Sequence, residues 1–451
     1  MKVLIATWGY PFTWGFATYN YKGRKVTAKT TLPVLINSLK PNKVYVIATD
    51  TVLVRPGEEG QKDREALRDI KTYGELKNRA KTLVEDYIKK NVVPLLDDKS
   101  IPIEVVVNYN SGTYNNFLHF KRTIEDYYRK LFEIFREIFA PYVGQAADID
   151  LYLDITHGIN YMPAFAFDAL KDFAKILSVN GKVNLTVLNS EPYPQPAPRD
   201  EQQQKNIHLS VYEVFKETYQ KDFIDTKIDT EGVIPTSDFN RQREVDTPFK
   251  SLEKLATATP EEERDVYTFL VSALEGYPLA VTQFFIEPQR LEQKIKETVE
   301  DYEGHTKVTH RVDGQISVKS ENELSKHLPV LVFAWILAKF IEKRYNGGLN
   351  REVSLRELFG LKNTLYKRNS TLEIFLTRNL KDFENQHERG RRKKISFYGE
   401  HLPKDMFRHF KAHSGLIFQF IDQIPTKEGY VYRYKPEEEE RVKKLILKSH
   451  S

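Results

Sequence analysis

The chain has 451 residues, of which 40% are hydrophobic and 29% are charged. This balance is typical of globular proteins and excludes collagen-like, low-complexity and disordered classes. The length predicts two or three domains of roughly 150 residues each. Lys and Arg number 68 against 63 Asp and Glu, a net charge of +5 that permits a polyanionic partner without requiring one. Cysteine is absent, which excludes disulfides, thiolate metal sites and cysteine nucleophiles and fits a reducing interior.

No segment predicts a membrane span or a signal peptide. The most apolar stretch, 328–341, is shorter than the roughly 20 residues that a spanning helix needs, and its flanks are charged, so we expect a core helix. The apolar run at 1–11 is too short for a signal peptide and predicts a buried first strand. We therefore expect a soluble, cytoplasmic protein with no membrane partner.

The first two hundred residues alternate between strand and helix patterns. The continuous apolar character of the strand patterns fits strands buried on both faces, as in a parallel sheet. Strands are predicted at 3–7, 44–49, 103–108, 151–155 and 183–189, and helices at 32–39, 64–90, 117–139 and 164–177. This rhythm predicts an α/β domain of the doubly wound, Rossmann-like type with a mostly parallel sheet.

The pattern changes after a polar, proline-rich stretch at 190–205, where we place the first domain boundary. The region up to about 320 is mixed, with helical patterns at 260–274 and 287–302 and a short hairpin at 307–318 that turns at Asp313-Gly314. From Glu321 onward the chain is expected to be almost wholly helical. Helices are predicted at 321–345, 371–384, 404–423 and 437–448, and the polar, basic segment 349–394 is interpreted as an insertion.

Two loops that follow strands carry side chains suited to a ligand, because ligands of open α/β sheets bind beyond the carboxyl ends of the strands. The loop 7–20 mixes glycine, hydroxyl and aromatic residues, which suits stacked bases and phosphates bound by backbone amides. The loop 154–160 leads into a helix whose N-terminus favours negative charge. There Gly158 lets a ligand approach the backbone, and Thr156 offers a hydroxyl. A third polar loop, 108–116, follows the third strand and is expected to line the same cleft.

The same residues have a purely structural interpretation, which stays open at this point. Gly and Thr after a strand are common in turns, and Asp154 fits a loop cap. No second histidine lies near His157, which favours a binding or positioning role over metal ligation. Asp150 and Asp154 bracket a strand about 13 Å long, too far apart to share an ion, so no metal is expected. The sequence has no G-x-G-x-x-G after the first strand and no G-x-x-x-x-G-K-[ST], which disfavours a dinucleotide oxidoreductase and a P-loop NTPase.

The carboxy-terminal half contains one segment whose side chains are suited to catalysis, an R-x4-H pair formed by Arg408 and His413. Apolar residues accompany His413 at helical spacing on one predicted face: Phe410, Ile417, Phe420 and Ile424. One interpretation is a core histidine beside a solvated arginine. The other is a histidine that titrates near neutrality and an arginine that binds a phosphate. On a regular helix the two side chains diverge by roughly 140°, so one phosphate meets both only through a kink, the long arginine arm or a second subunit.

A basic run lies just upstream and is either a solvated loop or a contact for an RNA backbone. Its cationic residues are Arg389, Arg391, Arg392 and Lys393.

These features together resemble a known family, the CRISPR-associated ribonucleases that join a CARF sensor to a HEPN nuclease. The resemblance covers essentially the whole chain. It rests on Thr7-Trp8-Gly9, on the segment Asp154-Ile-Thr-His-Gly158, and on Arg408-His-Phe-Lys-Ala-His413-Ser-Gly415. HEPN nucleases show R-x(4–6)-H with a polar residue after the arginine; His409 fills that place, where Asn is commoner. The implied organisation is a CARF domain at 1–195, a connector at 196–320 and an all-α HEPN domain at 321–451, with the insertion at 349–394.

The resemblance implies an endoribonuclease that is activated allosterically by a cyclic oligoadenylate, expected to be cyclic tetraadenylate. It would act in type III CRISPR antiviral defence as a homodimer or a higher assembly such as a trimer of dimers. It would cut single-stranded RNA without metal or cofactor, leaving a 2′,3′-cyclic phosphate, with Arg408, His409 and His413 as catalytic residues. The implied ligand-binding residues are Thr7, Trp8, Gly9, Trp14, Thr18, Ser111, Asp154, Thr156, His157, Gly158 and Asn160.

Two alternatives remain open on the sequence alone. One is a non-catalytic regulator, in which a nucleotide-sensing domain is joined to a module that binds DNA or a protein partner. The other is a sensor half that degrades its own cyclic ligand.

Overall fold

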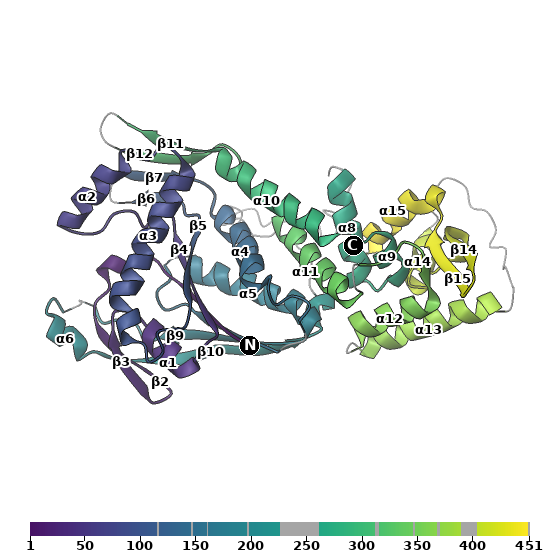
Figure 1. Cartoon of the computed structure of the whole chain (residues 1–451), viewed down its shortest axis with the longest axis horizontal. Coiled ribbons are helices and arrows are strands. Elements are labelled where there is room, and N and C mark those ends of the chain that lie inside the picture. The colour runs from purple at the N-terminus through teal and green to yellow at the C-terminus, as the bar shows by residue number, and fades with distance from the viewer. Residues whose placement is uncertain are drawn as a thin grey trace.

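The computed structural model describes residues 1–114, 117–145, 148–159, 161–195, 198–225, 261–311, 315–345, 348–367, 370–388 and 404–449. An α/β part and a mostly helical part lie side by side along the long axis of the molecule, and helices α10 and α11 run from the first to the second (Figure 1). The sheet of the α/β part extends past the boundary predicted at 190–205, because the strand His208–Gln220 still belongs to it.

A large mixed sheet forms the centre of the α/β part. Its strand order is β3-β2-β10-β9-β8-β1-β4-β5, and the neighbours from β9 to β5 are all parallel. β10 pairs antiparallel with β9 and parallel with β2, which forms an antiparallel hairpin with β3. The bounds are β1 Lys2–Thr7, β2 Ala17–Tyr21, β3 Arg24–Ala28, β4 Lys43–Thr49, β5 Ile103–Asn108, β8 Ile149–Asp154, β9 Lys182–Ser190 and β10 His208–Gln220.

Helices cover both faces of this sheet because its central strands are apolar on both sides. In β1, Val3 and Ile5 join the core on one face, while Leu4 and Ala6 join the core on the other. The helices of this part are α1 Leu32–Leu39, α2 Glu58–Leu67, α3 Tyr73–Asn91, α4 Ile124–Phe139, α5 Met162–Leu177 and α6 Glu201–Lys205. The expectation of an α/β fold with a mostly parallel, doubly covered sheet is confirmed.

A second, four-stranded sheet ties the connector to the α/β part. The hairpin of β11 (Thr306–His310) and β12 (Ile316–Ser320) was predicted, although its turn lies outside the described residues. β12 pairs in parallel with β7 (Leu118–Lys121), which in turn pairs with β6 (Gly112–Tyr114). The long helix α10 (Pro288–Gly304) leads directly into this hairpin. The connector is thus joined to the α/β part through the pairing of β12 with β7.

The second part contains helices and one small sheet. Its helices are α8 Glu261–Leu274, α9 Pro278–Gln283, α11 Leu328–Arg344, α12 Leu355–Tyr366, α13 Ser370–Glu388, α14 Lys404–Ala412 and α15 Glu439–Ser449. Three strands pair antiparallel in the order β13-β15-β14: Val353–Ser354, Gly429–Tyr434 and Ile421–Thr426. The all-α expectation for this half is therefore wrong, since residues 421–434 form a hairpin.

Several predicted helices have different bounds in the structure. The helix predicted at 64–90 is two helices, because the capping box of Thr72 and Glu75 starts α3 anew. The helix predicted at 117–139 begins at Ile124, after β7. The helix predicted at 404–423 ends at Ala412.

A continuous hydrophobic core joins the two parts of the chain. On one face of the sheet, α4 packs against α11, where the rings of Phe132 and Phe333 lie 5.5 Å apart. Arg136 of α4 lies over the Trp335 ring of α11 at 5.4 Å. The same core continues through α12, whose Leu358 and Leu361 are fully buried, although they lie in the segment interpreted as an insertion. Among the described helices, none is long and apolar enough to cross a membrane.

Candidate functional site

The loop after β8 is held in place by the buried carboxylate of Asp154. Its Oδ2 accepts a hydrogen bond from Thr31 Oγ1 at 2.5 Å, and its Oδ1 accepts one from the Thr156 amide at 3.0 Å. Burial raises the pKa of the Asp154 carboxyl, and the hydrogen bonds from Thr31 and Thr156 oppose that rise. Asp154 is 1% exposed, so it organises the loop from behind and does not line the open space in front of it.

His157 closes the same loop as a neutral imidazole. Its Nε2 accepts a hydrogen bond from the Thr31 amide at 3.2 Å, and its carbonyl accepts one from the Gly9 amide at 2.8 Å. Burial lowers the pKa of His157 to about 3, which agrees with a ring nitrogen that acts as an acceptor. The Trp14 ring covers the imidazole at a centroid distance of 4.2 Å, tilted by 30°. The loops that follow β1 and β8 therefore meet, as the sequence predicted.

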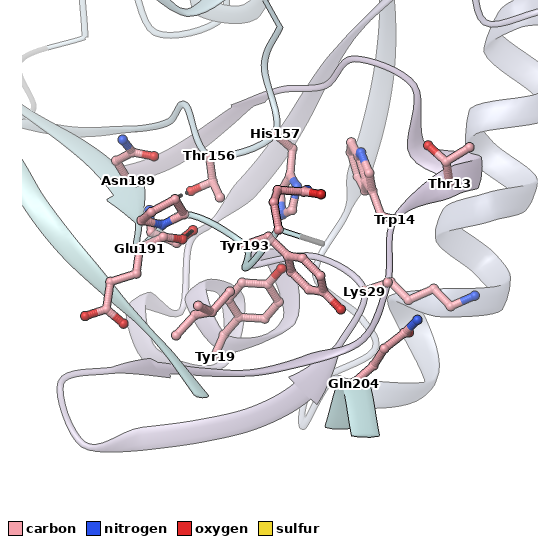
Figure 2. A pocket seen from close by; sticks show the side chains of 15 residues that line it. Thr13, Trp14, Tyr19, Lys29, Thr156, His157, Asn189, Glu191, Tyr193 and Gln204 are labelled. Carbon is pink, nitrogen blue, oxygen red and sulfur yellow. Dashed lines mark hydrogen bonds between the residues drawn. The ribbon is translucent and has the colours of Figure 1, made fainter. Parts of the chain in front are cut away.

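A cavity of about 520 Å³ opens beside His157 (Figure 2). Such a volume is ordinary for a small-ligand site, for which roughly 300–1,000 Å³ is usual. Of the residues that the sequence singled out, Trp14, Thr156 and His157 line it. Thr156 Oγ1 accepts a hydrogen bond from the Ser190 amide at 3.1 Å, which fixes the side chain at the cavity wall.

Three other predicted ligand residues are buried within the fold behind this cavity, and Gly158 lies half-buried beside them. Thr7 and Trp8 have no exposed surface, and Gly9 is buried. A Cβ atom at Gly158 would lie 2.7 Å from Thr7 Oγ1 and 2.6 Å from a carbon of Pro163, so this glycine permits close packing of the two loops. These residues do not line the cavity but support the two loops that do.

The remaining predicted ligand residues lie elsewhere. The Thr18 hydroxyl is shared with Thr27 at 2.7 Å and with the Lys205 carbonyl at 3.0 Å, so it braces β2. Ser111 lies beyond β5, where its hydroxyl donates to the Arg122 carbonyl at 2.7 Å, and it does not line the cavity. Asn160 lies outside the described residues.

Much of the cavity wall comes from residues that the sequence reasoning missed. Figure 2 shows Tyr19, Lys29, Glu191, Tyr193 and Gln204 around the space beside Trp14 and His157. The segment after β9 is tied to the first loop, because Tyr193 donates to the Phe16 carbonyl at 3.1 Å and Gln204 Oε1 accepts from the Phe16 amide at 3.0 Å. The proline-rich stretch at 190–205, which the sequence pattern predicts to be a domain boundary, therefore forms part of the cavity wall. Its one tyrosine, Tyr193, and its several glutamines were the available signal.

The Arg408–His413 segment forms the end of α14. Arg408 is exposed, whereas His409 and His413 are partly buried and their ring centroids lie 4.4 Å apart. The predicted helical face through Ile417 and Phe420 does not exist, because Ser414 and Gly415 adopt φ values of 52° and 74° and end the helix.

Helix α13 and strand β15 hold this turn. Asn379 Nδ2 donates to the buried Ser414 hydroxyl at 2.9 Å, and Tyr434 OH donates to the Gly415 carbonyl at 3.2 Å. A Cβ atom at Gly415 would lie 2.7 Å from Tyr434 OH. Burial lowers the pKa of His413, the adjacent His409 lowers it further, and Asp382 of α13 opposes the shift. The basic run Arg389, Arg391, Arg392 and Lys393 lies outside the described residues.

Comparisons with known proteins give a family match for the α/β part of the chain. Residues 3–192 match the CARF domain of the CRISPR system endoribonuclease Csx1. The CARF match thus contains β1, β8 and the loops around the cavity. A protein of Methanocaldococcus jannaschii described as CRISPR system endoribonuclease Csx1 is 25% identical over 483 aligned positions, which cover 99% of this chain and 94% of that protein. A solved structure of Enterococcus italicus Csm6 bound to cyclic hexa-2′-fluoro-hexa-dAMP aligns with 92% of this chain and 91% of that one, at 11% identity and a TM-score of 0.28.

Proposed function

We propose that the chain is an endoribonuclease of type III CRISPR defence that cuts single-stranded RNA when a cyclic oligoadenylate binds its CARF domain. The observation that carries this proposal is the extent of the alignment with the Methanocaldococcus protein. That relative is named as an endoribonuclease, and the aligned region spans 99% of this chain, including both the CARF match and the R-x4-H segment.

The cavity beside His157 is the site we assign to the activator. Trp14, Tyr19 and Tyr193 give it aromatic surface on which bases can stack, at roughly 1–3 kcal/mol per base. Lys29 lines the same space and supplies a positive charge for a phosphate. Because His157 is neutral and already accepts a hydrogen bond from Thr31, its role is to support Trp14 and the loop.

A ring with two-fold symmetry would contact the same cavity in two copies of the chain, which is the reason for proposing a homodimer. Cyclic tetraadenylate is the form we expect. Binding activates the nuclease only if the ring binds one arrangement of the dimer more tightly than another. The hydrophobic core that contains α4, α10 and α11 joins the two parts, so we propose that it carries such a change to the helical part.

We assign the RNase site to the end of α14. The ribose 2′-hydroxyl would attack the adjacent phosphorus, displace the 5′-oxygen and leave a 2′,3′-cyclic phosphate, a reaction that needs proton transfer and charge stabilisation but no metal or cofactor. Arg408 is exposed and suited to stabilise the phosphorane, and His413 is suited to proton transfer. The basic run at 389–393 is proposed as an RNA backbone contact.

The test is cleavage of a labelled single-stranded RNA in EDTA, with and without cyclic tetraadenylate. Wild type is compared with His413→Ala and with His305→Ala, an exposed histidine at the end of α10. We expect cleavage that needs the ring, survives the chelator and is lost only in His413→Ala. Tight ring binding without cleavage for any ring size would refute the nuclease and favour a regulator that binds DNA or protein.

A further inference from the structure

An exposed aromatic ring lies just beyond the turn that ends α14. Phe418 begins a short helical turn, Phe418–Phe420, and is 39% exposed. Its neighbours Leu416, Ile417 and Phe420 are buried, so this segment presents one of its apolar residues to solvent. Single apolar residues are common on protein surfaces, and exposure alone does not give Phe418 a function.

The Phe418 ring lies flat against a buried ring. Its centroid is 4.5 Å from that of Phe383 on α13, with an interplanar angle of 14°, so the two rings stack nearly in parallel. Phe383 is 2% exposed and is fixed in turn by Tyr432 of β15, whose ring meets it at 5.2 Å and 69°. Because Phe383 covers one face of Phe418, the exposed surface of Phe418 belongs to the opposite face and the edge. The three rings form a supported aromatic platform with one open face.

Helix α13 holds this platform beside the segment to which we assign the RNase site. Asn379 of α13 donates to the Ser414 hydroxyl at 2.9 Å. Phe383 follows Asn379 by four positions, so it lies on the same side of α13 and about 6 Å further along the helix. Ser414 and Phe418 are therefore fixed against successive turns of one helix.

The backbone between His413 and Phe418 is also tightly wound. The Leu416 amide donates to the His413 carbonyl at 2.9 Å, and the Ile417 amide donates to the Gly415 carbonyl at 3.0 Å. These bonds keep Phe418 close to the end of α14.

The two helices beside the platform expose positive charge. Arg378 and Lys381 of α13 and Arg408 of α14 all reach solvent. Arg378 has Asp382 at 3.8 Å, whereas no carboxylate pairs with Lys381 or Arg408 in the part of the chain that the structure describes. An open aromatic face beside free cations suits single-stranded RNA, whose bases stack and whose phosphates need neutralising. A second copy in a two-fold contact would bring the same cations to this surface, so the charge favours RNA over such a contact.

We propose that Phe418 is a substrate-binding residue of the RNase site, on which one base next to the cleaved bond stacks. This inference rests on the proposed RNase function and deepens it by naming the part of the substrate that the site holds. Every base has an aromatic face, so the platform accepts all four bases. The stack is present both before and during the reaction, so it strengthens RNA binding without changing the chemical step.

The first measurement is ring-stimulated cleavage of a labelled single-stranded RNA by wild type, Phe418→Ala and Phe418→Trp. We expect Phe418→Ala to raise KM roughly 5- to 150-fold with kcat little changed, the range for the loss of one stacked base. Phe418→Trp keeps an aromatic face and should keep the wild-type KM. An unchanged KM in Phe418→Ala, or a KM in Phe418→Trp as high as that of Phe418→Ala, overturns the platform and leaves the RNase proposal standing. Wild type that does not cleave at all overturns both.

Phe375 of α13 provides the matched control. It is 38% exposed, almost as much as Phe418, and it lies eight positions before Phe383, about 12 Å away along the helix. Phe375→Ala therefore removes the same side chain at the same exposure without touching the platform, and its KM should equal that of wild type. Equal rises of KM in Phe375→Ala and Phe418→Ala would overturn stacking as the cause.

Removing a base from the RNA tests the same contact from the other side. Once the cleaved bond is mapped, each flanking nucleotide is replaced in turn by an abasic one that keeps its 2′-hydroxyl. At the stacked position, wild type should lose about as much in kcat/KM as Phe418→Ala loses on intact RNA, and Phe418→Ala should lose nothing further. Losses that multiply independently at both positions would contradict a stack on Phe418.

The oligomeric state distinguishes RNA from a contact between subunits. Phe418→Ala should sediment as wild type does, with and without cyclic tetraadenylate. A shift of Phe418→Ala alone to a smaller species overturns the RNA role and makes Phe418 part of an interface between copies of this chain.

Discussion

Replacing Arg122 by Met removes one member of an ion pair that is fully enclosed between the α/β part and the connector. The side chains of Arg122 and Asp50 both have no exposed surface, and Arg122 Nη1 donates to Asp50 Oδ2. The guanidinium also donates from Nε to Ser320 Oγ at 3.1 Å and lies 4.4 Å from the Tyr73 ring centroid. Breaking such a pair by removing one partner leaves a buried charge and costs roughly 3–5 kcal/mol.

The sign of the pH dependence makes this prediction sharper. Burial raises the pKa of Asp50, and Arg122 is the largest influence that opposes this rise. Without Arg122 the folded-state pKa rises further above that of the unfolded chain, so the variant holds its stability best at low pH and loses it as pH increases. We therefore expect the difference from wild type to be largest at pH 7 and to shrink towards pH 4.

Urea unfolding followed by tryptophan fluorescence measures the effect, since Trp8 and Trp14 report on the α/β part and Trp335 reports on α11. Lys319→Met on the neighbouring strand β12 is the matched control, because Lys319 is exposed and surface substitutions usually change stability by less than about 0.5 kcal/mol. A loss below about 1 kcal/mol at pH 7, or a loss that is equal at pH 7 and pH 4, would refute the reasoning from burial.

Three further predictions concern the cavity and the turn at Ser414 and Gly415. Trp14→Ala should weaken binding of the activator by roughly 5- to 150-fold, because the loss of one stacking partner costs roughly 1–3 kcal/mol. Calorimetric titration with cyclic tetraadenylate measures the affinity. An unchanged affinity would show that Trp14 does not contact the activator. The pKa of His157 is about 3 in the folded chain and 6.5 in the unfolded chain. Wild-type stability should therefore be complete above pH 6.5 and fall as pH decreases towards 3. His157→Phe should flatten that slope in melting curves recorded from pH 7.5 to 4.5, and a slope equal to wild type would contradict a neutral His157. Gly415→Ala should lower stability by roughly 1–3 kcal/mol and impair cleavage, because the φ of Gly415 is 74° and an added Cβ would meet Tyr434. The control is Gly23→Ala, since Gly23 has a φ of 86° but open space around it and so reports the backbone strain alone. Equal losses of stability in the two variants would exclude the steric contact with Tyr434.

The central strands were predictable because burial on both faces leaves a local trace. The runs at 3–6 and 151–153 are continuously apolar, and the sheet places them side by side with Val3 opposite Leu151. β10 escaped prediction although it is the longest of the described strands, because its outward residues are unusually apolar for a surface: Tyr212 is 51% and Val214 is 54% exposed. Its mixed pattern gave no clear period.

Elements that depend on distant pairing were the ones missed. The segment 118–121 has enough helical character to be read as the start of α4, yet it is a strand because Leu118 pairs with Ile316, nearly two hundred residues away. The helix expected across residue 414 ends there because Ser414, a non-glycine residue, adopts a left-handed conformation, which residue type alone rarely signals.

The sequence predicted one wall of the cavity, formed by the loops after β1 and β8, but not the wall formed by the segment after β9. The loops after β1 and β8 were found because strand ends of a parallel sheet gather at one edge. The wall formed by Tyr193 and Gln204 was not, since these residues reach the cavity through contacts with distant residues: their hydrogen bonds to Phe16 and the pairing of β10 with β2. Similarly, the spacing of Arg408 and His413 drew attention to that pair, whereas the contact that the structure brings forward joins His409 and His413.

The packing of α4 against α11 limits how this chain can be divided into fragments that fold separately. Phe132 and Arg136 have their partners Phe333 and Trp335 in a helix that follows them by about two hundred residues, so a chain cut in the 190–205 loop would leave both apolar faces bare. A chimera that borrows the sensor of a relative must therefore also borrow α10, the β11–β12 hairpin and α11 as one unit.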